Sequence, residues 1–203
     1  DWTKDPKRQP MLNNPDPSYH GMVWTEFAKA VGPIAYIVRA RFVGLRDLGP
    51  ALSPQSAFQI IQGLETVSLR MEKHCANAAK VAEYLSNHNK VSRVIYAGLD
   101  EGEAGDRANK YLKGGHGALC GFELKGGKSS GEKFINNLNM FYHVANIGDA
   151  RSLAIHPATT THSQLSDEDM ESAGVNPSYV RLSIGIEHID DILNDLKNAL
   201  DAA

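Results

Sequence analysis

Hydroxyl and imidazole side chains are concentrated in one stretch of the chain, residues 146–166, which reads NIGDARSLAIHPATTTHSQLS. Three consecutive threonines (159–161) lie between His156 and His162, and apolar stretches flank the whole segment. An ordinary connecting loop does not need so many hydrogen-bonding groups. The composition therefore predicts that this segment surrounds something small and polar.

Different roles are expected for the histidines, the serine and the threonines of this segment. A zinc site is disfavoured because six positions separate His156 from His162 and no cysteine or carboxylate completes a set at ligand spacing. Structural hydrogen bonding is the expected role of both histidines. Ser152 lacks the Gly-x-Ser-x-Gly setting of a nucleophile, so we expect it to support the loop. The β-branched threonines are stiff and predict an extended segment, with Thr159 and Thr161 on one face.

Arg181 is the other candidate for chemistry, because it lies near the start of the apolar run YVRLSIGIE. Burying a guanidinium without an anionic partner is costly. Its planar fork matches a carboxylate with two parallel hydrogen bonds. The partner is either a structural aspartate or glutamate of the protein or the carboxylate of a ligand, and the pattern leaves both open.

The elements that must position these residues form an α/β pattern from about residue 64 onward. A helix capped by Ser53 is expected to run to about residue 88, with a break near Gly63, since apolar residues recur there at steps of three and four. Runs of β-branched and aromatic residues indicate strands. The expected strands are 91–98, 117–127, 141–148 and 179–187, and the expected later helices are 104–112, 129–140, 166–174 and 188–200.

Residues 1–63 do not form an obvious domain. Residues 1–22 are rich in Pro, Asn and Asp and predict an irregular arm, and residues 23–48 predict a helix broken near Gly32-Pro33. We expect residues 1–63 to be the tail of a preceding domain and residues 64–203 to be an α/β domain.

Composition excludes several classes of protein. The 203 residues carry a net charge of −3 with scattered basic residues, so no basic stripe for nucleic acid is present. No apolar run approaches the roughly 18 residues that span a bilayer, and the N-terminus lacks the apolar core of a signal peptide. Cys75 and Cys120 fit neither a disulfide framework nor a metal site. A cytoplasmic protein with reduced thiols is expected.

Four motifs in order resemble the C-terminal half of the Cys/Met-metabolism enzymes that use pyridoxal phosphate. They are LRDLGPALSP, GLETVSLRMEKHCANAAKVAEYL, ANIGDARSLAIHPATTTHSQLS and VRLSIGIEHIDDILNDL, and together they extend over nearly the whole chain. The resemblance implies an aspartate-aminotransferase-like fold (fold type I) with a large cofactor domain and a smaller C-terminal domain, in homotetramers. It also implies that the cofactor lysine, in a Ser-x-Thr-Lys setting, belongs to an N-terminal half, because no lysine of this sequence has that setting.

Within the family, PDPSYHG and HVANIGDARSL are most similar to the O-acetylhomoserine sulfhydrylase branch. That branch replaces the γ-acetoxy group of O-acetyl-L-homoserine with sulfide or a thiol. The resemblance assigns Arg181 to the α-carboxylate of the amino-acid substrate and Thr161 to the mouth of the site. Asn146 stands where cystathionine lyases have a serine that contacts the carboxylate, so its role is either substrate contact or termination of a strand. The alternatives are a methionine or cystathionine γ-lyase, a cystathionine γ-synthase, or a non-catalytic α/β dimerisation or binding module.

Overall fold

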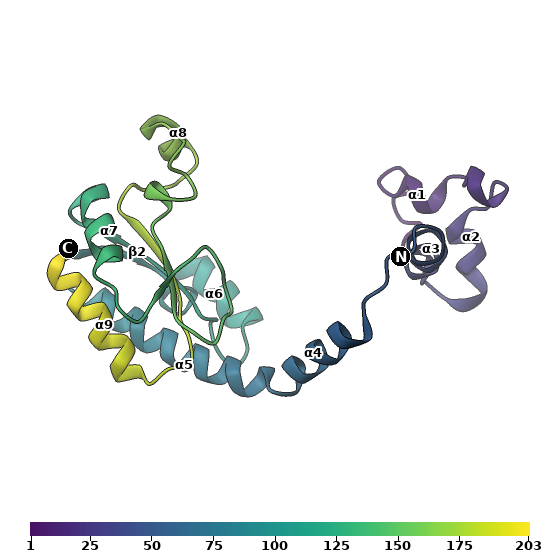
Figure 1. Ribbon diagram of the computed structural model, residues 1–203. Helices are drawn as coiled ribbons and strands as arrows, with labels where there is room; N and C mark the ends of the chain where they lie inside the picture. Colours follow the sequence, from purple (N-terminus) through teal and green to yellow (C-terminus); the bar gives the residue numbers. More distant parts are fainter. The chain divides into compact units, whose positions relative to one another are not determined.

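A computed structural model describes residues 1–203, with the side chains of all of them except residues 167 and 171. The chain divides into two compact units, Asp1–Gln62 and Gly63–Ala203. Each is described by itself (Figure 1). No helix in the described part of the chain is long and apolar enough to cross a membrane.

The first unit is a small helical cluster built around Trp24. The Trp24 side chain is fully buried with Leu12, Ala28, Ala35 and Val38, and its indole Nε1 donates a hydrogen bond to Asp16 Oδ2 at 2.9 Å. The break expected near Gly32-Pro33 is confirmed, since helices end at Val31 and resume at Ala35. The elements are α1 (Pro10–Asn13), a 3₁₀ turn (Pro17–Tyr19), α2 (Trp24–Phe27), a 3₁₀ turn (Ala28–Val31), α3 (Ala35–Arg39) and a π-helix (Ala40–Asp47).

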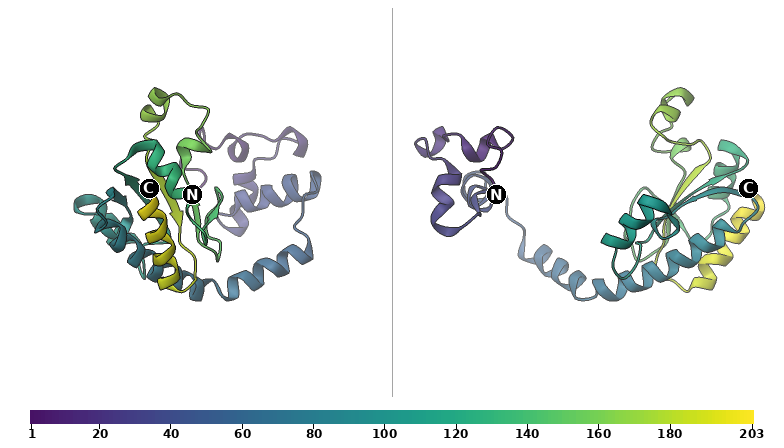
Figure 2. Two further views of the ribbon diagram at one scale, coloured as in Figure 1. Left: turned by 60° about the vertical axis from the view of Figure 1, so that its left-hand side comes forward. Right: turned by 180° about the vertical axis from the view of Figure 1, so that it is seen from behind.

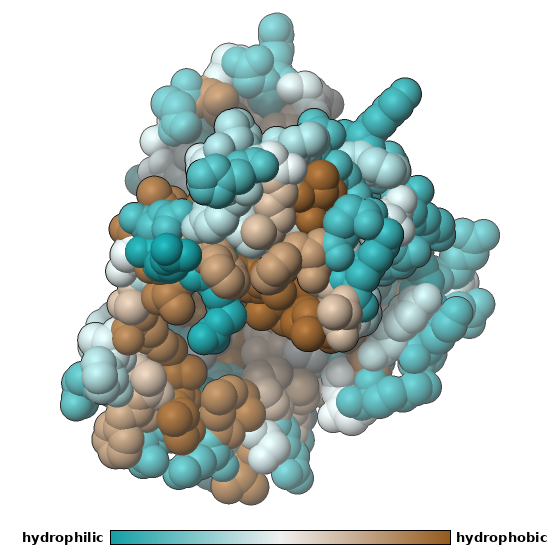
Figure 3. All heavy atoms as spheres, turned by 90° about the vertical axis from the view of Figure 1, so that its right-hand side faces the viewer, coloured by the Kyte–Doolittle hydropathy of each residue, from teal (hydrophilic) through white to brown (hydrophobic). Residues whose placement is uncertain are grey.

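Two consecutive helices follow, α4 (Pro54–Glu65) and α5 (Val67–Ser86). Ser53 caps α4 as expected, because its Oγ accepts a hydrogen bond from the Ser56 N–H at 3.1 Å. The interruption lies at Thr66 and not at Gly63, which is a correction of three residues. No residue of α4 is buried. Apolar side chains are exposed on the surface shown in Figure 3, and on α4 the exposed ones include Phe58, Ile61 and Leu64.

The second unit is a five-stranded sheet in the order β1-β2-β5-β4-β3. All neighbouring strands are antiparallel except β3 and β4, which are parallel. The predicted mixed α/β class is confirmed, although the strand expected at 141–148 is reduced to two residues and β4 was not predicted. The strands are β1 (Val91–Ile95), β2 (Leu119–Leu124), β3 (Tyr142–His143), β4 (Leu153–Ile155) and β5 (Tyr179–Ser183).

Helices cover one face of this sheet. Figures 1 and 2 show α5 and α9 side by side against it, and α7 packs on β2 and β5. The core between them contains Phe122, Leu182 and Leu196, each fully buried. The later helices are α6 (Gly102–Tyr111), α7 (Gly127–Asn136), α8 (Asp167–Ser172) and α9 (Ile189–Ala202).

The opposite face of the sheet carries the polar residues of interest. Along β5, Val180 and Leu182 point into the core and are fully buried, whereas Tyr179 and Arg181 are only partly buried. This alternation follows from the period of two in a strand. Arg181 is paired with Gly121 of β2 on one side and with Ile155 of β4 on the other. We call this surface the open face.

Candidate substrate-carboxylate site

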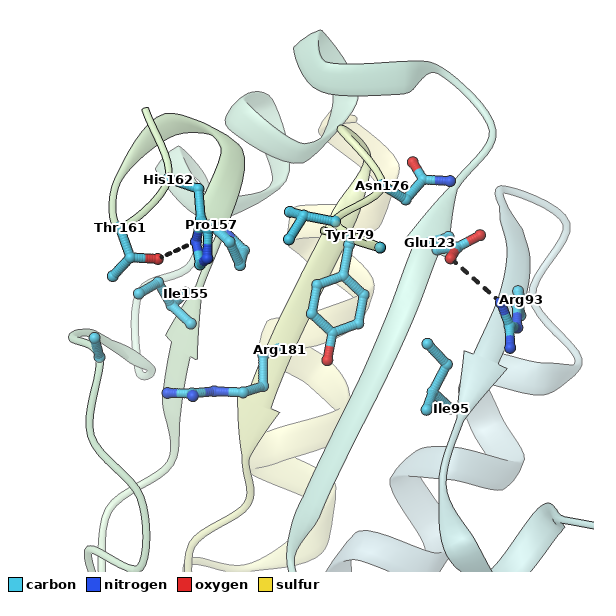
Figure 4. A pocket seen from close by; sticks show the side chains of 13 residues that line it. Arg93, Ile95, Glu123, Ile155, Pro157, Thr161, His162, Asn176, Tyr179 and Arg181 are labelled. Carbon is cyan, nitrogen blue, oxygen red and sulfur yellow. Dashed lines mark hydrogen bonds and ion pairs between the residues drawn. The ribbon is translucent and has the colours of Figure 1, made fainter. Parts of the chain in front are cut away.

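A cavity of about 480 Å³ lies on the open face of the sheet. Residues of β1, β2, β4 and β5 form its floor, and residues 157–162 and 174–176 form further walls (Figure 4). Arg181 and Thr161, two of the three predicted site residues, both line it. The sheet therefore brings these two residues, twenty positions apart in the sequence, to one concave surface.

The Arg181 guanidinium has a hydrogen-bond acceptor but no anionic partner among the described side chains. Its Nη2 donates to the Asn146 backbone carbonyl at 3.3 Å, and no ion pair joins it to a carboxylate within the part of the chain described here. Arg93, on the far side of the same cavity, differs in this respect because its Nη1 lies 3.8 Å from Glu123 Oε1. Arg181 thus retains positive charge and unused donors that face the cavity.

Asn146 contacts Arg181 through its backbone and not through its side-chain amide. The residue is exposed at the start of the loop between β3 and β4. The Gly148 N–H donates to Ser183 Oγ at 3.1 Å, which ties this loop to the end of β5. The structure therefore places the Asn146 backbone carbonyl beside the Arg181 guanidinium.

Ser152 supports the same loop, as expected. The residue is fully buried, its N–H donates to Glu187 Oε1 at 2.7 Å and its hydroxyl donates to Glu187 Oε2 at 3.0 Å. Its Oγ also accepts from the Gly185 N–H at 2.9 Å. These bonds fasten the loop to the segment that directly follows β5.

Two buried polar residues of α5 hold that segment from the other side. His74 Nδ1 lies 2.6 Å from the Ile184 carbonyl, and Asn77 Nδ2 donates to the carbonyls of Gly185 and Glu187 at 3.0 and 2.9 Å. Sequence reasoning did not select them. The available signal was their spacing of three positions on the apolar side of a helix, where a polar residue requires a partner.

The threonine run is a turn and not an extended segment. Pro157–Thr159 form a 3₁₀ turn, and the Thr160 hydroxyl donates back to the His156 carbonyl at 2.9 Å. The extended prediction is wrong because Pro157 favours the first position of a helical turn and short hydroxyl side chains stabilise such turns. Thr161 Oγ1 lies 2.9 Å from His162 Nδ1 at the cavity wall.

His156 is a structural residue, as expected. It is fully buried, with Nδ1 at 2.9 Å from Thr159 Oγ1 and Nε2 at 2.8 Å from the Pro177 carbonyl. Burial lowers the pKa of His156 from its ordinary value of 6.5, and the bond to Pro177 opposes this only in part. A neutral ring therefore links the turn to the segment that leads into β5.

Comparisons with known proteins identify the family of this chain. The family profile of the Cys/Met metabolism PLP-dependent enzymes matches residues 18–201. The O-acetyl-L-homoserine sulfhydrylase of Leptospira meyeri is 54% identical over 195 residues, covering 93% of this chain and 44% of the relative. The homocysteine synthase of Schizosaccharomyces pombe is 48% identical over 203 residues, covering 100% of this chain and 47% of the relative.

A solved structure shows the same fold. A crystal structure from Campylobacter jejuni, assigned to an O-acetylhomoserine (thiol)-lyase and containing a pyridoxyl-lysine monophosphate, has a TM-score of 0.80 at 42% identity, over 94% of this chain and 44% of that one. The chain spans about half the length of the curated relatives that it matches. The mixed α/β unit is that of a fold type I enzyme. The chain belongs to the Cys/Met metabolism PLP-dependent enzyme family.

Proposed function

We propose that this chain is the C-terminal part of a PLP-dependent O-acetylhomoserine sulfhydrylase and supplies the wall of the active site that binds the substrate α-carboxylate. In the complete enzyme, sulfide or a thiol adds at Cγ of O-acetyl-L-homoserine as acetate leaves, giving homocysteine or methionine. The observation that carries the proposal is the Arg181 guanidinium, which faces a cavity without a carboxylate partner among the described residues. The sulfhydrylase and homocysteine synthase relatives support it.

The same proposal covers the organisation of the protein. Residues 1–63 are the end of the large cofactor domain and residues 64–203 are the C-terminal α/β domain. The partner is an N-terminal half, and the complete enzyme is a homotetramer, as the resemblance implies. Free Cys75 and Cys120 support a reducing compartment such as the cytoplasm.

Pyridoxal phosphate supplies the electron-withdrawing ring of the reaction when bound. The cavity wall does not itself fit the cofactor, because attachment of its aldehyde needs a lysine amine and none of the described residues that line the cavity is a lysine. We therefore assign cofactor binding to the N-terminal half.

The residues of this chain bind and orient the substrate. The Arg181 fork donates two hydrogen bonds to the α-carboxylate, while Nη2 also donates to the Asn146 carbonyl at one end of the guanidinium. Thr161 and His162 form the adjoining wall. Holding the carboxylate in place restricts the orientation of the bonds at Cα, which lowers the entropic part of the barrier.

The test is substitution of Arg181 in the complete enzyme. A hydrogen bond to a charged group contributes about 1.5–3 kcal/mol, so Arg181→Ala is expected to lower kcat/KM by about 10- to 150-fold. Arg181→Lys should recover only part of this, because an ammonium keeps the charge and loses the fork. Arg93→Ala is the matched control, since Arg93 lies on the same cavity and is paired with Glu123.

Three outcomes would contradict the proposal. Unchanged kcat/KM in Arg181→Ala would remove the carboxylate role. Release of an α-keto acid, with no incorporation of sulfide, would instead indicate a γ-lyase. Use of cysteine as the preferred thiol would indicate a cystathionine γ-synthase.

A further inference from the structure

Tyr179 and Gly121 occupy the part of the open face directly beside Arg181. Tyr179 precedes Arg181 by two positions on β5 and therefore points to the same side of the sheet. Gly121 of β2 is the residue paired with Arg181. Where a side chain would normally stand next to Arg181 across the strands, there is only a glycine.

The ring of Tyr179 fills the space that this glycine leaves. A Cβ atom at Gly121 would overlap the Tyr179 Oη and would lie 2.5 Å from Cε2 and 2.8 Å from Cζ. Such contacts are too short for carbon atoms, so the ring can take this position only over a glycine. Tyr179 and Gly121 thus form a matched pair across β5 and β2.

This pair blocks one of the two directions open to the Arg181 side chain. The guanidinium could lie over Gly121 toward β2 or over Ile155 toward β4, because Arg181 is paired with both residues. Figure 4 shows it extending to the side of Ile155 and away from the Tyr179 ring. The hydrogen bond to the Asn146 carbonyl lies on that same side.

The chemistry of a tyrosine suits this position. Burial raises the pKa of Tyr179, and the nearby Arg181 charge opposes this shift only in part, so the phenol is neutral near pH 7. A neutral ring does not compete with a substrate carboxylate for the guanidinium, as an acidic residue would. No hydrogen bond joins the Tyr179 hydroxyl to Arg181 in the part of the chain described, so its influence is steric.

We propose that Tyr179 is a positioning residue, which occupies the space over Gly121 and thereby directs the Arg181 guanidinium toward the substrate α-carboxylate. The inference rests on the proposed function, since it assumes that Arg181 binds this carboxylate. It adds Tyr179 and Gly121 as the residues that determine the direction in which the Arg181 guanidinium points.

The test measures carboxylate recognition separately from overall binding. Inhibition constants of the complete enzyme are determined for L-norvaline and for butylamine, which has the same carbon chain and amine without the carboxylate. The inhibition constant of butylamine divided by that of L-norvaline reports the contribution of the carboxylate. A purely structural role of Tyr179 would weaken both inhibitors alike and leave this ratio unchanged.

The expected result is a graded series. Arg181→Ala should lower the ratio by about 10- to 150-fold, and Tyr179→Ala should lower it by part of that, about 5- to 10-fold. Tyr179→Phe keeps the ring and should stay within about twofold of the parent enzyme, because the hydroxyl makes no bond to Arg181. Gly121→Ala should act like Tyr179→Ala, since its Cβ displaces the ring.

The double variant isolates the contact between the two residues. Once the ring is gone, Gly121→Ala has nothing to displace, so Tyr179→Ala combined with Gly121→Ala should behave as Tyr179→Ala alone. If Tyr179→Ala does not fold, Gly121→Ala and Tyr179→Phe still test the same displacement. An unchanged ratio in Tyr179→Ala or Gly121→Ala, or a loss in Tyr179→Phe equal to that in Tyr179→Ala, overturns the inference. An unchanged ratio in Arg181→Ala overturns the proposed function itself.

Discussion

Glu187 is predicted to control the order of the loop that carries Asn146. Its two carboxylate oxygens accept from the N–H and the hydroxyl of Ser152 at 2.7 and 3.0 Å. No other side chain in the described part of the chain bonds to both groups of Ser152. Glu187→Ala should therefore loosen the loop between β3 and β4, which the bonds from Gly185 N–H to Ser152 Oγ and from Ile186 N–H to the Ala150 carbonyl still hold.

The magnitude follows from the two bonds. Each hydrogen bond to a charged group contributes about 1.5–3 kcal/mol, which sets an upper bound of about 6 kcal/mol. Glu187 is partly exposed, so water can reach the released donors and the loss is smaller. We expect the free energy of local opening to fall by about 2–3 kcal/mol, or a 30- to 150-fold loss of protection. Glu187→Gln keeps one accepting oxygen and should lose about half as much.

Hydrogen exchange of the complete enzyme, followed by mass spectrometry of peptides over residues 146–155, measures this opening directly. Asp190→Ala is the matched control, because it removes a nearby carboxylate whose side chain is 82% exposed. The L-norvaline inhibition constant should rise in parallel, because the Asn146 carbonyl accepts a hydrogen bond from Arg181. Equal protection in Glu187→Ala and the parent enzyme would refute the reasoning.

Two further predictions concern pH and association. Burial lowers the pKa of His156 below its ordinary 6.5, so on acidification the locally open state binds a proton before the closed state does. The free energy of opening of residues 153–157, measured by hydrogen exchange, should therefore fall between about pH 7.5 and about pH 5.5. A fall of the same size in His156→Gln would contradict this. The isolated chain should self-associate through the exposed Phe58, Ile61 and Leu64 of α4. The prediction would be contradicted if light scattering gave the mass of a monomer both for this chain and for a variant with these three residues changed to serine.

Much of this chain could be predicted from local patterns. The strand over 179–187 contains β5, and the helix over 188–200 nearly coincides with α9 (Ile189–Ala202), because their periods of two and of 3.6 residues are carried by the residues themselves. Arg181 could also be selected from the sequence, because a guanidinium in an apolar strand requires a polar partner. The family could be predicted because each of its motifs is a continuous stretch of the sequence.

The arrangement around Arg181 depended on the tertiary structure. Strand β4 has only three residues, which is too short for a period to be seen, and it becomes a strand only by pairing with β3 and β5. The contact of Arg181 with the Asn146 backbone could not be predicted, because any residue type can offer a carbonyl. Tyr179 over Gly121 likewise depends on the register of two strands separated by more than fifty residues. Side-chain types show which groups need partners, but only the pairing of distant strands decides which partners they find.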